Sequence, residues 1–171
     1  MNDAIATLKK GEGRLLQAGG MWVFDNEIER ISGDFKNGDM IQIQAFNGYP
    51  LGRGFINLHS KIRIRLMTRH ANQVIDDSFL KMRVQNAWEY RKKTVDISSC
   101  RVIFGEADFL PGLVIDKFSE VLVVQCTALG MEQFKQQIVA ICIELMAADG
   151  ITIRGVYERS DAKVRTSEGM E

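Results

Sequence analysis

A run of arginines alternates with aliphatic residues between positions 62 and 69. Isoleucine or leucine occupies positions 62, 64 and 66, and the other parity carries Arg63, Arg65 and Arg69. Successive side chains of a β-strand point to opposite faces, so this pattern predicts a strand that buries its aliphatics and presents its guanidinium groups outward. Like charges on one face repel each other, and a polyphosphate would compensate them. The alternative is that acidic side chains from elsewhere in the fold pair with these arginines.

The charge around this strand is locally one-sided. The 22 basic and 22 acidic residues of the chain cancel, but no acidic residue lies between Asp39 and Asp76, where Arg53 and Lys61 join the strand arginines. A local basic patch can hold a phosphate backbone even on a neutral protein. A second basic stretch surrounds two glycines and comprises Lys9, Lys10 and Arg14. Because glycine lets the backbone approach a phosphate closely, we interpret this stretch as a further phosphate contact; a solvated turn is the alternative.

Residues suited to catalysis are scattered. Glu106 and Asp108 lie in a turn-rich run at 104–113, but no histidine or third ligand is near them in sequence, which favours a structured loop over acid–base or metal chemistry. His59 and His70 are isolated and are expected at the surface. The cysteines are odd in number and lack metal-ligand spacing, which indicates a reduced, cytoplasmic protein: Cys100, Cys126 and Cys142. These patterns predict no catalytic residue and no metal site.

The elements that would position the basic residues are short strands. Turn residues separate them, among them the pair Asn47-Gly48, a strong hairpin signal because both residues tolerate positive φ. Many short strands with closely spaced turns predict a small β-barrel. The strand-like runs are 27–31, 40–46, 51–57 and 62–69. Aromatic residues in this half could stack on RNA bases, although a place in the core is more typical of them: Trp22, Phe24 and Phe46.

The second half predicts an α+β unit. Asp76 or Asp77 caps a helix with an apolar stripe that includes Phe79, Leu80 and Trp88. An EEHEE-like arrangement follows, with strands at 101–104, 113–116 and 121–126, a helix at 131–146 and a strand at 153–158. We expect a barrel domain at 1–72 and an α+β domain at 73–171. The last strand would lack a pairing partner, which suggests that the second domain is truncated.

Three blocks of the sequence carry a resemblance to a known family. They are Leu8–Leu16 running into Trp22–Ile28, then Gly105–Phe118, and finally Val156–Asp161 followed by Val164-Arg165 and Glu168–Glu171. In order and separation they resemble the RlmI-like ribosomal RNA large-subunit methyltransferases, which make 5-methylcytosine in 23S rRNA. The second and third blocks are the more specific. One departure is Gly20-Met21, where the family often has histidine and proline before the tryptophan.

The resemblance implies three domains: an RNA-binding PUA barrel, a central α+β domain, and a Rossmann-like domain that binds S-adenosylmethionine and holds the catalytic cysteine. This chain would comprise the first domain and most of the second, with the Rossmann-like domain absent. It would hold no cofactor and be inactive alone, and none of its cysteines is carried over as the nucleophile. The expected RNA contacts are Lys9, Lys10, Arg14, Arg53, Arg63, Arg65 and Arg69. The expected interdomain residues are Tyr157, Glu158, Arg159, Ser160, Asp161 and Arg165.

The partners that this resemblance implies are ribosomal RNA, the chain's own methyltransferase domain and a second copy of the chain. No apolar run approaches the ~18 residues of a membrane span, so no membrane partner is expected. One alternative is a free-standing PUA-domain adaptor that binds RNA without catalysis. A second is a barrel that binds a protein partner, which the weaker salt dependence of its binding would distinguish from RNA recognition.

Overall fold

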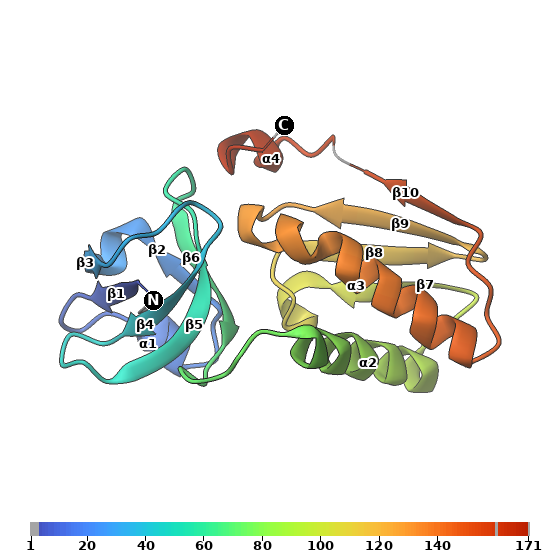
Figure 1. Ribbon diagram of the computed structural model, residues 1–171, viewed down its shortest axis with the longest axis horizontal. Coiled ribbons are helices and arrows are strands. Elements are labelled where there is room, and N and C mark those ends of the chain that lie inside the picture. The colour runs from blue at the N-terminus through green and yellow to red at the C-terminus, as the bar shows by residue number, and fades with distance from the viewer. Residues whose placement is uncertain (1–3, 160, 171) are drawn as a thin grey trace. The chain divides into compact units, whose positions relative to one another are not determined.

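The computed structural model describes residues 4–159 and 161–170 and divides into two compact units (Figure 1). The first unit comprises the chain up to Gln73 together with Thr166–Met170, and the second comprises Val74–Arg165. The observed division lies one residue beyond the expected boundary between 72 and 73. It also assigns Thr166–Met170 to the first unit, where the sequence placed them in the second.

The first unit is a six-stranded sheet that curls around a core, in the order β2-β6-β5-β4-β1-β3 (Figure 1). Pairing is antiparallel except between β1 and β4. The strands are β1 (Ile5–Leu8), β2 (Trp22–Phe24), β3 (Ile28–Ser32), β4 (Met40–Gln44), β5 (Pro50–Ile56) and β6 (Ile62–Thr68). Short helices α1 (Arg14–Gln17) and η1 (Asp25–Glu27) connect them, and α4 (Val164–Ser167) lies where the chain passes back into this unit. The small barrel-like sheet expected from the strand pattern is therefore present.

Alternation of apolar and polar residues explains how the first unit builds its core. On β4 the side chains of Ile41 and Ile43 are buried, while Met40, Gln42 and Gln44, which alternate with them, are half-exposed. On β6, Ile64 and Leu66 are buried as the parity predicts. A close backbone approach joins β5 to β6, since a Cβ at Gly52 would lie 2.2 Å from the Thr68 carbonyl oxygen. Only glycine is compatible with that approach.

The second unit is a four-stranded sheet in the order β10-β9-β8-β7, covered by two helices. Its elements are α2 (Asp77–Thr94), β7 (Ser99–Phe104), η2 (Gly105–Asp108), β8 (Leu113–Phe118), β9 (Val121–Cys126), α3 (Leu129–Ala148) and β10 (Gly155–Glu158). After α2 the order is strand, strand, strand, helix, strand, so the EEHEE label is wrong although each expected element is present. The last strand has a partner, because β10 pairs in parallel with β9.

The first long helix begins where the sequence predicts it. The Asp76 side chain accepts a hydrogen bond from the Phe79 backbone N–H at 2.9 Å, which caps α2. Phe79, Leu80 and Trp88 lie on its buried face as expected. Within the described residues, no helix combines the length and apolar character that crossing a membrane requires.

Candidate nucleic-acid interface

The basic loop between β1 and α1 presents its cations to solvent. Gly13 has φ +83°, and a Cβ there would lie 2.9 Å from Leu8 Cδ1. The fold itself therefore favours glycine at this position, independently of any ligand. Lys10 and Arg14 are exposed. Lys9 is exposed too, and its ammonium donates to the Asn26 carbonyl oxygen at 2.7 Å. A carbonyl partner leaves the positive charge of Lys9 uncancelled.

Arg69 joins this loop in space although it lies far along the chain. Its guanidinium donates to the Leu16 carbonyl oxygen and, at 2.8 Å, to the Gly20 carbonyl oxygen. Both acceptors lie at the C-terminal end of α1, where carbonyl groups lack intrahelical partners. Arg69 therefore caps the C-terminal end of α1 and adds an exposed cation to that of Arg14 at the start of the same helix.

The other strand arginines contradict the expectation of an open, unopposed cationic face. Arg65 is buried; its guanidinium lies 3.1 Å from Glu168 Oε1 and 5.7 Å from the Trp22 ring centre. Arg63 donates to the Leu58 carbonyl oxygen and lies 3.8 Å from Asp25 Oδ2. No acidic residue lies in the sequence between Asp39 and Asp76, but the fold brings the carboxylates of Asp25 and Glu168 from other segments to its arginines. The outward, unpaired placement expected for Arg63 and Arg65 is therefore wrong.

Glu168 is held in a buried polar cluster within the first unit. The Asn57 amide donates to its backbone oxygen at 2.8 Å and to its carboxylate at 3.0 Å. Burial alone would raise the pKa of Glu168, but hydrogen bonds from Ser60 and Asn57 and the charge of Arg65 outweigh it and lower that pKa. The carboxylate thus stays ionised and neutralises Arg65.

Arg53 occupies an intermediate position among the predicted contacts. It is half-exposed on β5 opposite Thr68 and donates to the Gln73 carbonyl oxygen at 2.9 Å. The seven predicted residues thus fall into two groups. Those associated with carbonyl oxygens or solvent are Lys9, Lys10, Arg14, Arg53 and Arg69, and those paired with carboxylates are Arg63 and Arg65.

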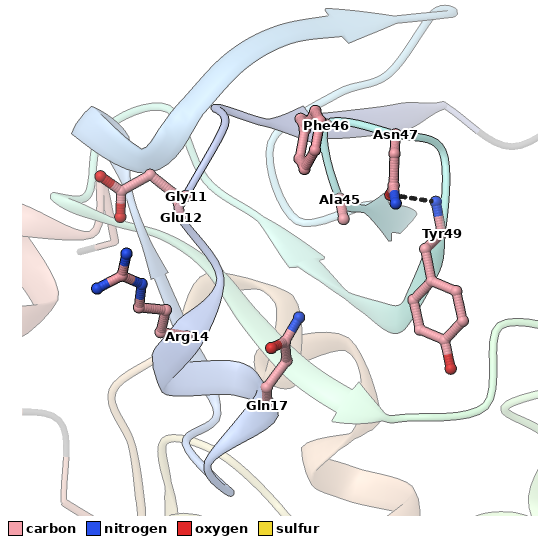
Figure 2. Close-up of a pocket in the computed structure, with 8 residues that line it drawn as sticks. All are labelled: Gly11, Glu12, Arg14, Gln17, Ala45, Phe46, Asn47 and Tyr49. Carbon is pink, nitrogen blue, oxygen red and sulfur yellow. Dashed lines mark hydrogen bonds between the residues drawn. The ribbon is translucent and has the colours of Figure 1, made fainter.

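A pocket of about 280 Å³ opens beside the basic loop (Figure 2). Two aromatic rings of the turn between β4 and β5 contribute to it, Phe46 at 52% exposure and Tyr49 at 65%. The core position favoured for Phe46 is therefore wrong, whereas Trp22 packs against the core as expected. Sequence reasoning missed Tyr49, although an aromatic residue directly after Asn47-Gly48 is a visible signal. The full lining is Gly11, Glu12, Arg14, Gln17, Ala45, Phe46, Asn47 and Tyr49.

The second unit uses its chemically reactive side chains for structure. Asp108 receives two hydrogen bonds from the Arg91 guanidinium, both at 2.6 Å, and one from the Phe104 backbone N–H at 2.7 Å. The predicted structured loop is thereby confirmed. Burial raises the pKa of Cys126 and Cys142 to about 12, which keeps both thiols protonated. Among the residues that the structure describes, no group of three or more histidine, cysteine or carboxylate side chains could hold a metal.

The charged residues expected at the joint to another domain have partners within the second unit. Glu158 lies 2.6 Å from Lys135, and Arg159 lies 2.9 Å from Asp161. Arg165 is buried and donates to the Cys126 carbonyl oxygen at 2.8 Å. Tyr157 is exposed, and Ser160 falls outside the described residues. Within this segment Arg159 pairs with Asp161, whereas Glu158 and Arg165 pair with Lys135 and Glu132 of α3. Contact of these residues with another domain stays a prediction.

Known proteins share the sequence and the fold of this chain. Residues 6–69 match the family described as a PUA-like domain. The chain is 34% identical over 167 residues, 96% of its length, to the ribosomal RNA large subunit methyltransferase I of Pseudoalteromonas translucida, of which it covers 41%. It is 37% identical over 153 residues, 88% of its length, to the protein of the same name from Alteromonas mediterranea, of which it covers 37%. A solved Streptococcus mutans protein, provisionally described as a SAM-dependent methyltransferase, has TM-score 0.74 at 15% identity, over 94% of this chain and 41% of that one.

The chain spans about two fifths of the length of the curated relatives that it matches. The likeness to the Streptococcus mutans structure shows a common fold. The resemblance noted on the sequence blocks is confirmed by relatives that match nearly the whole chain. The chain is therefore a relative of the ribosomal RNA large subunit methyltransferase I proteins, and it carries a PUA-like domain within residues 6–69.

Proposed function

We propose that the first unit binds ribosomal RNA through the cations around α1, on behalf of an S-adenosylmethionine-dependent enzyme that methylates C5 of a cytosine. The observation that carries the proposal is the difference between the two groups of basic residues. Lys9 and Arg69 donate to neutral carbonyl groups and keep their charge, whereas Arg65 is neutralised by Glu168. Lys10 and Arg14 are exposed as well, on the loop and helix that Lys9 and Arg69 adjoin. We call these four cations the α1 patch: Lys9, Lys10, Arg14 and Arg69.

Phosphate contacts of this kind position a substrate without reading its sequence. Arg53 supports the α1 patch from β5, while Arg63 and Arg65 act in the fold of the unit. An rRNA substrate also places the protein in the cytoplasm. The methyl transfer itself would fall to the part of the enzyme that the curated relatives contain beyond the matched two fifths. The three cysteines of this chain are poor candidates for the nucleophile, because burial raises the pKa of each thiol, to about 12 for Cys126 and Cys142.

Binding of an rRNA fragment measured at several salt concentrations tests the proposal. If four phosphates contact the α1 patch, the logarithm of the binding constant should fall against the logarithm of salt with a slope of about −3 for single-stranded RNA. Reversing two charges with Lys10→Glu and Arg14→Glu should reduce the slope to about −1.5. The matched control is Lys36→Glu, an exposed lysine of the same unit outside the patch. Equal losses in the two variants, or a slope near zero, would contradict the proposal.

A free-standing RNA-binding adaptor is the alternative. Incubating the chain with rRNA and labelled S-adenosylmethionine should give no incorporation under either view. The enzyme and adaptor hypotheses are distinguished by adding the catalytic part of a relative as a separate chain and measuring methylation of the rRNA. Methylation stimulated by this chain, and lost in the Lys10→Glu/Arg14→Glu variant, supports the enzyme; binding without stimulation supports the adaptor. Self-association and contact with a catalytic domain through Tyr157–Asp161 and Arg165 stay predictions.

A further inference from the structure

We propose that the pocket beside the α1 patch receives a single unstacked nucleobase, held against Phe46 and Tyr49. The proposal rests on RNA binding by the first unit and adds the part of the RNA that this site recognises. Two stretches of the unit build the pocket, the loop and helix at residues 11–17 and the turn at residues 45–49 (Figure 2). Its volume of about 280 Å³ lies at the small end of ligand sites, which suits one flat ring system.

The exposed rings are the first observation. Aromatic side chains bury large apolar areas in most folds, so two exposed rings on one short turn need a reason. Phe46 and Tyr49 are 52% and 65% exposed and line the same pocket. Recognition of single-stranded RNA uses aromatic rings as stacking surfaces for splayed bases. The rings therefore fit an unpaired segment of RNA better than a regular duplex.

The turn that carries the rings is preorganised. The Ala45 backbone N–H donates to the Tyr49 carbonyl oxygen at 2.8 Å, and the Gly48 N–H donates to the Ala45 carbonyl oxygen at 2.9 Å. The Asn47 side chain accepts the Tyr49 backbone N–H at 3.1 Å (Figure 2). Gly48 has φ +83°, which favours glycine at this position. A turn held by three hydrogen bonds loses little freedom when a base stacks on it.

The opposite wall supplies polar groups suited to a nucleotide. Arg14 at the start of α1 can reach the phosphate that flanks a splayed base, and Gln17 presents an amide that can bond to a base edge (Figure 2). Glu12 also lines the pocket, and its carboxylate repels phosphate. A site for inorganic phosphate would need neither the rings nor the amide and would exclude the acid. The combination instead favours a base, with its phosphate on the side of Arg14.

The test uses the whole chain, a short single-stranded oligouridylate and an RNA duplex of equal charge. Phe46→Ala and Tyr49→Ala should each weaken binding of the single strand about tenfold, without changing the salt slope, because neither variant alters charge. Duplex binding should change little. Tyr157→Ala is the matched control, since Tyr157 is also 65% exposed but lies on β10. Tyr49→Phe should bind as the unaltered chain does, because the ring is kept.

Two further measurements separate the ways in which the proposal could fail. An oligonucleotide that lacks its bases should bind the unaltered chain about as weakly as oligouridylate binds the Phe46→Ala/Tyr49→Ala variant, and the variant should not distinguish the two probes. Glu12→Gln should tighten binding of either probe. Unchanged affinity for oligouridylate in both alanine variants overturns the base site, and so does an equal loss toward the duplex. If Lys10→Glu/Arg14→Glu still loses affinity in that case, RNA binding by the first unit survives.

Discussion

Replacing Glu168 by glutamine should destabilise the first unit strongly. The Glu168 and Arg65 side chains are 3% and 10% exposed and lie 3.1 Å apart. Glutamine keeps the shape of the side chain and can still accept from the Asn57 amide, so the main loss is the negative charge. The buried Arg65 would then keep its positive charge, because a guanidinium cannot be deprotonated, but it would lack the carboxylate that neutralises it.

The expected loss is about 3–5 kcal/mol, the range found when one partner of a buried ion pair is removed. A domain of this size has a free energy of unfolding of only ~5–15 kcal/mol, so the change is a large fraction of it. Asp25→Asn is the control in the same unit, since Asp25 is 46% exposed and lies 3.8 Å from Arg63. Loss of that longer pair, whose carboxylate is exposed, should cost less than about 1 kcal/mol.

Urea denaturation followed by tryptophan fluorescence measures both changes. Trp22 lies in the first unit and contacts Arg65, so it reports on this unit in a Trp88→Phe background, where the second tryptophan is removed. The pair should also respond to pH. The folded-state pKa of Glu168 is lowered, so its contribution is complete above the ordinary glutamate pKa of about 4.3 and is lost as the pH falls through the lower folded value. Glu168→Gln should remove that part of the acid sensitivity.

A loss below about 1 kcal/mol for Glu168→Gln would refute the reasoning, because the pair would then behave as an exposed one. The double variant Arg65→Met/Glu168→Gln gives a second criterion. Removing both charges leaves neither the guanidinium nor the carboxylate of this pair buried without its partner, so the double variant should be more stable than Glu168→Gln alone. If the loss of stability in the double variant, relative to the unaltered chain, equals the sum of the losses in Arg65→Met and Glu168→Gln, the two side chains do not interact energetically.

Three further predictions concern the rest of the chain. Asp108→Asn should destabilise the second unit by about 3–5 kcal/mol, measured by urea denaturation, because it breaks the buried two-bond pair with Arg91; wild-type stability would contradict this. Cys126 and Cys142 should resist a thiol reagent at pH 8 and react after unfolding, since their pKa is raised to about 12; rapid labelling of the native chain would refute their burial. Gly13→Ala should cost about 1–2 kcal/mol in thermal unfolding, because φ is +83° and the Cβ would press on Leu8; an unchanged melting temperature would show that the loop adapts.

The elements of both units could be predicted from local patterns. Period-two alternation located β4 and β6, the Asn47-Gly48 pair located the hairpin turn, and Asp76 with the apolar stripe after it located α2. These signals are local because side-chain direction in strands and helices depends on residues a few positions apart. The same patterns identified the loop of Lys9, Lys10 and Arg14, which the structure leaves exposed.

The sequence by itself determined which residues carry charge and which face of each element they share. Only the tertiary structure decided which charges are cancelled. Glu168 pairs with Arg65 across 103 positions of the chain, whereas Arg69 reaches the carbonyl end of α1 and keeps its charge. Likewise, only the folded sheet leaves Phe46 and Tyr49 exposed beside Arg14. Pairing and exposure depend on distance in space, and composition along the chain carries almost no information about contacts so remote in sequence.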